Sequence, residues 1–169
     1  MDIVEGSLRF EFPESYQASK YDDWSHYRNQ FENKCSIGNK AIDFIAFENR
    51  KTLWLCEVKD FRIGQRKRGK PPLEEEISQK VRDTLAGLVS AKFQANNSDE
   101  KEFAINSLEC EIIRMVLHIE QPRGKHQIYD LKDLKDKLKN LIKAIDPHPI
   151  VINAELCHSQ PDLPWSVSD

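Results

Sequence analysis

The stretch Lys40–Arg62, KAIDFIAFENRKTLWLCEVKDFR, contains the features from which the fold of this chain can be predicted. Residues 41–47 are apolar apart from Asp43, and residues 52–58 form a second apolar run that is rich in aromatic and branched side chains. The polar residues 48–51 separate the two runs. This pattern predicts two short β-strands joined by a tight turn.

Three charged residues, Asp43, Glu57 and Lys59, interrupt these apolar runs. Side chains alternate between the two faces of a strand, so Glu57 and Lys59 are expected to project from the same face. A hairpin that turns at residues 48–51 places Asp43 beside them. The sequence therefore predicts two carboxylates and one ammonium together at one end of a hydrophobic hairpin.

Such a group of charges has two interpretations. One is an ordinary buried ion pair, in which Lys59 neutralises Glu57 or Asp43. The other is a site for a hard divalent cation, because buried carboxylates are costly unless they are paired or bind a metal, and Mg²⁺ is the usual choice. Three charged residues at this spacing favour the metal site. The lysine would then orient a water molecule or stabilise developing negative charge.

Asp43 followed after thirteen residues by Glu57-Val58-Lys59 resembles the motif of the PD-(D/E)XK (restriction-endonuclease-like) nuclease superfamily. The resemblance covers about residues 38–120. It implies a mixed central β-sheet flanked by helices, and cleavage of nucleic-acid phosphodiesters with Mg²⁺ or Mn²⁺. It also implies that Asp43, Glu57 and the carbonyl of Val58 bind the metal, and that Lys59 positions or activates the attacking water.

The same resemblance implies candidate active-site residues outside the hairpin. Ile42 stands where the proline in the superfamily's name would be. In some branches a glutamine of the following helix lines the active site, which makes Gln79 a candidate, with a solvent-facing glutamine as the alternative. Some relatives have an additional upstream acid, and the positions that could supply it are Glu5, Glu14 and Glu32.

A basic segment follows the second strand directly. It combines five cationic residues with Gly64 and Gly69 inside residues 62–70. Its position beside the carboxylates predicts a clamp for a phosphate backbone, and a solvated surface loop is the alternative. The five predicted nucleic-acid-binding residues are Arg62, Arg66, Lys67, Arg68 and Lys70.

Hydrophobic periodicity predicts the remaining elements. A long helix between the hairpin and the next strand would make that strand parallel to residues 52–58, whereas the hairpin itself is antiparallel. The fold class is therefore α/β, a mixed central sheet with helices on both faces. The expected elements are an early strand at residues 3–12, helices at about 22–33, 73–95, 99–107 and 131–145, strands at 111–119 and 150–156, and an irregular tail from His158.

Composition places the chain among soluble globular proteins, with 169 residues, 39% hydrophobic and 31% charged residues, and a net charge of −3. We expect a single domain over residues 1–169, with the C-terminal helix and strand at about 130–157 packed on the core. No apolar run approaches the ~20 residues that span a bilayer. The first residues lack a basic segment followed by a long apolar stretch, so we expect no secretory signal. The four cysteines form no Cys-x-x-Cys pair, which favours reduced thiols in a cytoplasmic protein.

The function predicted from the resemblance and from these residues is metal-dependent hydrolysis of nucleic-acid phosphodiester bonds, with DNA as the expected substrate. Asp43, Glu57 and Lys59 would be the catalytic residues. The alternative is a non-enzymatic, nuclease-like domain that binds nucleic acid or a protein partner. The sequence leaves open DNA or RNA as the partner, and it leaves open a homodimer.

Overall fold

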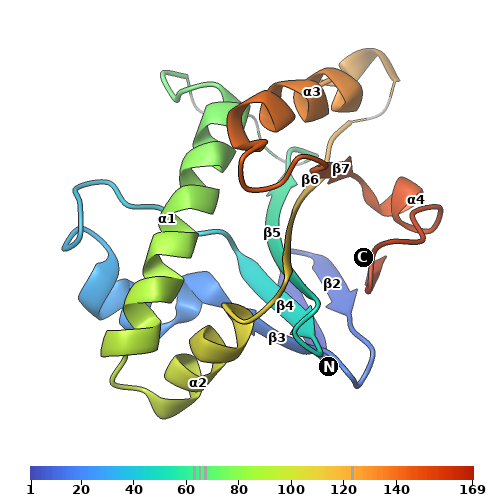
Figure 1. The fold of residues 1–169 in the computed structure, drawn as a ribbon. Coiled ribbons are helices and arrows are strands. Elements are labelled where there is room, and N and C mark those ends of the chain that lie inside the picture. Colours follow the sequence, from blue (N-terminus) through green and yellow to red (C-terminus); the bar gives the residue numbers. More distant parts are fainter. Residues whose placement is uncertain (63, 65, 67, 123) are drawn as a thin grey trace.

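A computed structural model of the chain describes residues 1–62, 64, 66, 68–122 and 124–169 (Figure 1). Its central element is a five-stranded mixed sheet in the order β3-β4-β5-β6-β7. The strands of this sheet are β3 (Gln17–Lys20), β4 (Phe44–Glu48), β5 (Thr52–Asp60), β6 (Ile112–Glu120) and β7 (Ile150–Ile152).

The predicted hairpin is present as β4 and β5, which pair antiparallel. Its turn contains Asn49 and Arg50 at φ values of 48° and 56°. These two successive left-handed residues form the centre of a tight turn, which is closed by a 3.1 Å hydrogen bond from the amide of Lys51 to the carbonyl of Glu48. β6 pairs parallel to β5, as the long helical connection between them predicts. Both sequence-based pairings are confirmed.

Three helices cover one face of this sheet: α1 (Leu73–Gln94), α2 (Ser98–Ser107) and α3 (Leu131–Ile142). Asn97 and Asp130 cap α2 and α3 by accepting hydrogen bonds from first-turn amides. Ile77 and Val81 of α1 and Leu138 of α3 pack with the sheet residues that face them in one buried cluster. Figure 1 shows α1 running along the sheet on the side away from β2.

The other face of the sheet is covered mainly by a second, three-stranded antiparallel sheet in the order β1-β2-β8, with the short helix α4 (Ala154–Cys157) beside it. The expectation of helices on both faces is corrected here, because a sheet covers most of this face and its helix α4 is four residues long. The early strand divides at Gly6, whose φ is 61°, because a tight turn there lets the chain fold back on itself. The irregular tail was also predicted wrongly, since its end pairs with β2. The strands are β1 (Asp2–Glu5), β2 (Leu8–Glu11) and β8 (Ser166–Ser168).

The aromatic segment before the hairpin forms short turns instead of the continuous helix predicted at residues 22–33. They are the 3₁₀ helix η1 (Tyr21–Asp23) and the π-helical turn η2 (Tyr27–Phe31). The aromatic side chains of this segment lie in the core. A further 3₁₀ turn is η3 (Gly124–His126). Among the described residues, no helix is both long and apolar enough to cross a membrane.

Candidate functional site

The structure brings the three charged residues of the hairpin together. Glu57 and Lys59 lie two residues apart on β5 and point to the face that α1 covers. Asp43 immediately precedes β4, and the pairing of Phe44 with Cys56 places it beside Glu57. The period of two along the strands is therefore sufficient to assemble this part of the site.

A cation from α1 completes the arrangement. The ammonium of Lys80 contacts Oε1 of Glu57 and lies 3.7 Å from Oδ1 of Asp43. Lys59 Nζ lies 2.5 Å from the same Glu57 oxygen. The second oxygen of Asp43 accepts a 2.6 Å hydrogen bond from the backbone N–H of Val58. Val58 thus meets Asp43 through its amide.

The ion pairs continue beyond Glu57. Lys59 Nζ is 3.7 Å from Oε1 of Glu76 on α1, and Arg66 pairs with the other oxygen of Glu76 at 2.5 Å. Acids and bases alternate along the whole row, so each buried charge has an opposite charge beside it. We call this row the charge cluster; it consists of Asp43, Lys80, Glu57, Lys59, Glu76 and Arg66.

Burial dominates the electrostatics of the charge cluster. It raises the pKa of the Asp43 carboxyl from 3.8 to about 7, and the Glu57 carboxylate adds to this rise. Burial alone would lower the pKa of Lys80, but the carboxylates of Glu57 and Asp43 raise it overall. Glu57 is fully buried, and its Oε2 has no hydrogen-bond partner among the described residues.

The acid pair is near enough to share one cation, and in this structure the shared cation is the ammonium of Lys80. Within the described part of the chain, no group of three or more His, Cys, Asp or Glu residues could hold a metal ion. Two carboxylates, one with a free oxygen, are nevertheless ligands of the type that Mg²⁺ prefers. Binding of Mg²⁺ or Mn²⁺ at Asp43 and Glu57 stays a prediction.

Hollows flank the charge cluster on two sides. The first, of about 380 Å³, is lined by Asp43 and Lys80 together with the upstream acid Glu32. The second, of about 270 Å³, is lined by Lys59, Glu76, Arg66 and Lys70 among others. The cluster is thus reachable from solvent at both ends.

The remaining upstream acids do not line the first hollow. Glu14 is exposed, and Glu5 pairs with Lys20 at 2.8 Å. Asp22, which was not among the predicted upstream acids, does line it. Burial raises the pKa of Asp22 to about 6, and the nearby Asp43 contributes to the rise.

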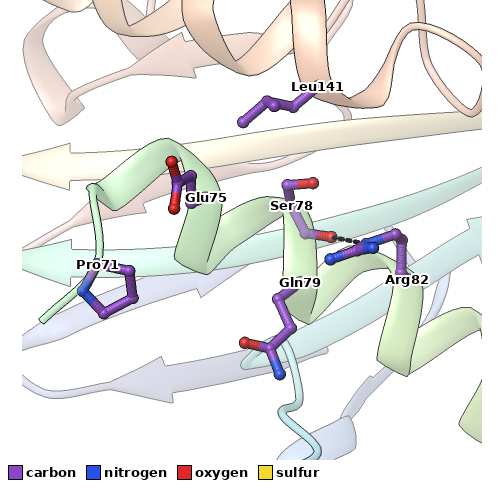
Figure 2. A pocket seen from close by; sticks show the side chains of 6 residues that line it. All are labelled: Pro71, Glu75, Ser78, Gln79, Arg82 and Leu141. Carbon is purple, nitrogen blue, oxygen red and sulfur yellow. Dashed lines mark hydrogen bonds between the residues drawn. The ribbon is translucent and has the colours of Figure 1, made fainter.

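Gln79 lies on a different side of α1 from the lysine that follows it. Figure 2 shows its side chain beside a pocket of about 360 Å³ whose lining also includes Arg82 and Leu141 of α3. Its amide nitrogen donates to the carbonyl of Gly38 at 2.9 Å and to Asp83 at 3.3 Å. Gln79 therefore anchors the loop before β4, and Lys80 is the α1 residue that reaches the acid pair.

The basic segment is partly engaged within the protein. Arg62 pairs with Asp60 at 2.7 Å and with Asp169 at 2.6 Å, and Arg66 belongs to the charge cluster. The exposed cations of the segment are Arg68 and Lys70. Lys67 lies outside the described residues.

Sequence reasoning missed Lys80 and Glu76, the two α1 members of the charge cluster. A signal for them exists in the sequence. They are four residues apart and each is followed by a core residue, Ile77 or Val81, so they border the buried stripe of the helix. Charged residues at that border, opposite a strand that contains acids, indicate an inter-element ion pair.

Comparison with known proteins gives a result that motif reading did not predict. The chain is 34% identical over 211 aligned residues to a cysteine–tRNA ligase of Neisseria meningitidis serogroup A / serotype 4A (strain DSM 15465 / Z2491). The alignment covers 98% of this chain but only 29% of the relative, so the chain spans less than a third of that protein's length. No protein-family model and no solved structure matches the chain.

This match corrects the assignment to the PD-(D/E)XK nuclease superfamily. The relative is named a ligase that acts on tRNA, not a phosphodiester hydrolase. The predictions of a nuclease, of an endonuclease and of a hydrolase as the enzyme class are overturned by it. The motif misled because an acid followed by Glu-x-Lys on paired strands also builds a buried ion-pair network, as the charge cluster shows. The resemblance implied catalytic roles for Asp43, Glu57 and Lys59, and these roles stay untested, whereas the grouping of the three residues stands on the geometry.

Proposed function

We propose that the chain is a non-enzymatic, RNA-binding domain that holds tRNA for a cysteine–tRNA ligase in the cytoplasm. The observation that carries the proposal is the alignment of nearly the whole chain with part of such a ligase. An appended domain that binds the same RNA raises the local concentration of substrate without taking part in the chemistry.

The distribution of exposed cations supports this proposal. Arg68 and Lys70 are exposed at one end of α1, and Pro71 and Leu141 line one pocket, which brings α3 to the same end. Phosphate backbones are bound mainly by such unpaired cations, through release of counterions. The exposed lysines of α3 and of its C-cap that have no ion pair among the described residues are Lys132, Lys135, Lys139 and Lys143.

The interior of the charge cluster supports a binding role as well. Lys59, Lys80 and Arg66 are each paired with a carboxylate. These pairs hold β5, α1 and the start of the basic segment in one arrangement. The cluster then serves as a scaffold for the exposed Arg68 and Lys70, which remain free to contact RNA.

Neutralising Arg68 and Lys70 together to glutamine is expected to weaken tRNA binding. The slope of log K against log salt should become shallower by about 1.5, because each lost phosphate contact contributes about 0.7–0.9. Filter binding between 50 and 200 mM salt measures this slope. The matched control is Arg50→Gln/Lys51→Gln, an equal loss of charge at the β4–β5 turn. Absence of tRNA binding by the unaltered chain, or equal binding of duplex DNA, would contradict the proposal.

We also propose that Mg²⁺ or Mn²⁺ can occupy the acid pair only in exchange for the Lys80 ammonium. Asp43 and Glu57 would hold the ion, and the ion would supply a positive charge beside a bound phosphate. Lys80→Met should raise Mn²⁺ affinity at least about tenfold, because a unit charge a few ångströms away is removed. Calorimetric titration of metal-stripped, folded protein checks this, with Lys92→Met on the same helix as the control. No Mn²⁺ binding by either the unaltered chain or the Lys80 variant would refute the site.

A further inference from the structure

The outer face of α1 carries a row of side chains that are not covered by the rest of the protein. The members of the row recur at alternating spacings of four and three residues, which places them on one side of the helix, opposite the buried Ile77 and Val81. Val89 is 48% and Phe93 63% exposed, so the C-terminal end of the row is apolar. We call this row the α1 stripe; it consists of Glu75, Gln79, Arg82, Ala86, Val89 and Phe93.

The N-terminal half of the α1 stripe borders the pocket of about 360 Å³. Figure 2 shows Glu75, Gln79 and Arg82 along this pocket, which Leu141 of α3 faces from the other side. A cavity of about 150 Å³ admits benzene, so the pocket has room for a phenyl ring. Pro71 and Leu141 offer apolar contacts to such a ring, and the guanidinium of Arg82 can lie over its face.

The apolar end of the stripe and the pocket are arranged for reciprocal contact between two copies of the chain. Gln79 and Phe93 are fourteen residues apart on α1, which is about 21 Å along the helix axis, and Ala86 lies midway between them. When two α1 helices lie antiparallel with a twofold axis at Ala86, each Phe93 reaches the pocket of the other copy. Ala86 has the smallest side chain of the stripe, so the two helices can approach closely where the axis passes.

The charges at the two ends of the stripe are complementary as well. Nζ of Lys92 lies 5.9 Å from the ring centroid of Phe93, and Nζ of Lys101 on α2 donates to the Phe93 carbonyl at 3.4 Å. At the other end, the exposed Glu75 lines the pocket. Antiparallel pairing therefore brings two cations of one copy toward a carboxylate of the other, which favours association of the chain with itself.

We propose that the α1 stripe is the interface of a homodimer. Two copies of α1 lie antiparallel with Ala86 on the twofold axis, and Phe93 of each copy fills the pocket of the other. An isologous contact of this kind is complete with two copies, so no larger assembly is expected. This inference goes beyond the proposed RNA-binding function and does not depend on it.

Phe93→Ser is expected to raise the dissociation constant of the dimer at least about thirtyfold, because aromatic side chains that fill a partner's pocket are the most costly interface residues to lose. Sedimentation equilibrium at several protein concentrations measures this constant. Val4→Ser replaces an exposed apolar residue of β1, in the other layer of the protein, and should leave the constant unchanged. Because Phe93 is exposed in the single chain, its replacement should not lower the unfolding temperature of the monomer.

Ala86→Cys tests the position of the axis, in a Cys35→Ser chain that lacks the exposed native thiol. Mild oxidation should join two copies through this cysteine, because residues on the axis of a close helix crossing come within the roughly 4.4–6.8 Å Cα separation of a disulfide. Gln94→Cys in the same background is the matched control. It is exposed and eight residues from Ala86, so its two copies lie about 24 Å apart and should not be joined. Non-reducing gel electrophoresis separates the products.

The possible results separate this inference from the proposed function. A monomer at all concentrations up to about 1 mM would overturn the dimer. A dimer that Phe93→Ser does not weaken, or equal cross-linking at positions 86 and 94, would assign self-association to another surface and overturn it as well. Binding of a cysteine–tRNA ligase polypeptide to a monomeric chain, lost in Phe93→Ser, would replace the second copy with a different protein. Absence of tRNA binding would overturn the proposed function and leave the dimer standing.

Discussion

Replacing Lys80 with methionine is expected to lower the free energy of unfolding by about 3–5 kcal/mol at pH 8. The ammonium of Lys80 is largely buried and is the cation that Asp43 and Glu57 share. Methionine keeps the length of the side chain but leaves Asp43 without an ion-pair partner. Breaking a buried pair by removing one member is costly because an uncompensated charge remains in a medium of low polarity.

Urea unfolding monitored by tryptophan fluorescence measures this loss. Lys92→Met is the matched control, because Lys92 lies on the same helix over the ring of Phe93 and has no ion pair with a carboxylate in the part of the chain that the structure describes. Its change should be below about 1 kcal/mol. A loss for Lys80→Met as small as that of the control would show that the charge cluster is a surface network with little effect on stability.

The same region predicts how stability depends on pH in metal-free buffer. The pKa of Asp43 is about 7 in the folded chain against 3.8 ordinarily, so between these values the folded state holds a proton that the unfolded state has released. Stability therefore falls as pH rises from about 4 to 7, by at most roughly 4 kcal/mol from this group. Asp43→Asn should remove that part of the slope. In Lys80→Met the decrease in stability should extend to higher pH. The ammonium of Lys80, which lowers the pKa of Asp43 in the unaltered chain, is then absent.

Gly87→Ala is expected to destabilise the protein by about 1–3 kcal/mol, although alanine normally favours a helix over glycine. A Cβ at this position on α1 would lie 2.0 Å from Oη and 3.3 Å from Cζ of the fully buried Tyr21. Neither the tyrosine in the core nor the helix that packs on it can move far, since interiors are closely packed. The substitution therefore forces a shift of the η1 segment or of α1.

Tyr21→Phe tests the cause of this effect. Oη of Tyr21 is buried without a hydrogen-bond partner among the described residues, so its removal should be neutral or stabilising by about 1 kcal/mol. In the Tyr21→Phe background, Gly87→Ala should cost much less, because the atom at 2.0 Å has been removed. Thermal unfolding of the four chains of this double-mutant cycle gives the coupling. Additive effects would mean that the two positions do not clash.

The sequence by itself determined the centre of the fold. The apolar runs at residues 41–47 and 52–58 are long enough, and their turn polar enough, to specify the β4–β5 hairpin by local pattern alone. The alternation of side chains on β5 was also sufficient to place Glu57 and Lys59 together. The same pattern could not distinguish a metal site from an ion-pair network, because the deciding residue, Lys80, comes from another element.

Only the tertiary structure decided which other elements pack around the β4–β5 hairpin and complete its charge cluster. The tail strand β8 is three residues long, too short for any periodicity, and forms because β2 offers it a pairing edge. The aromatic segment before the hairpin divides into the 3₁₀ helix η1 and the π-helical turn η2, and its rings join the core cluster of α1 and the sheet, which the periodicity of the segment alone did not predict. Lys80 becomes the partner of Asp43 and Glu57 because α1 crosses the sheet at that point. The position of the crossing depends on the packing of the whole core, so it cannot be predicted from any local stretch of sequence.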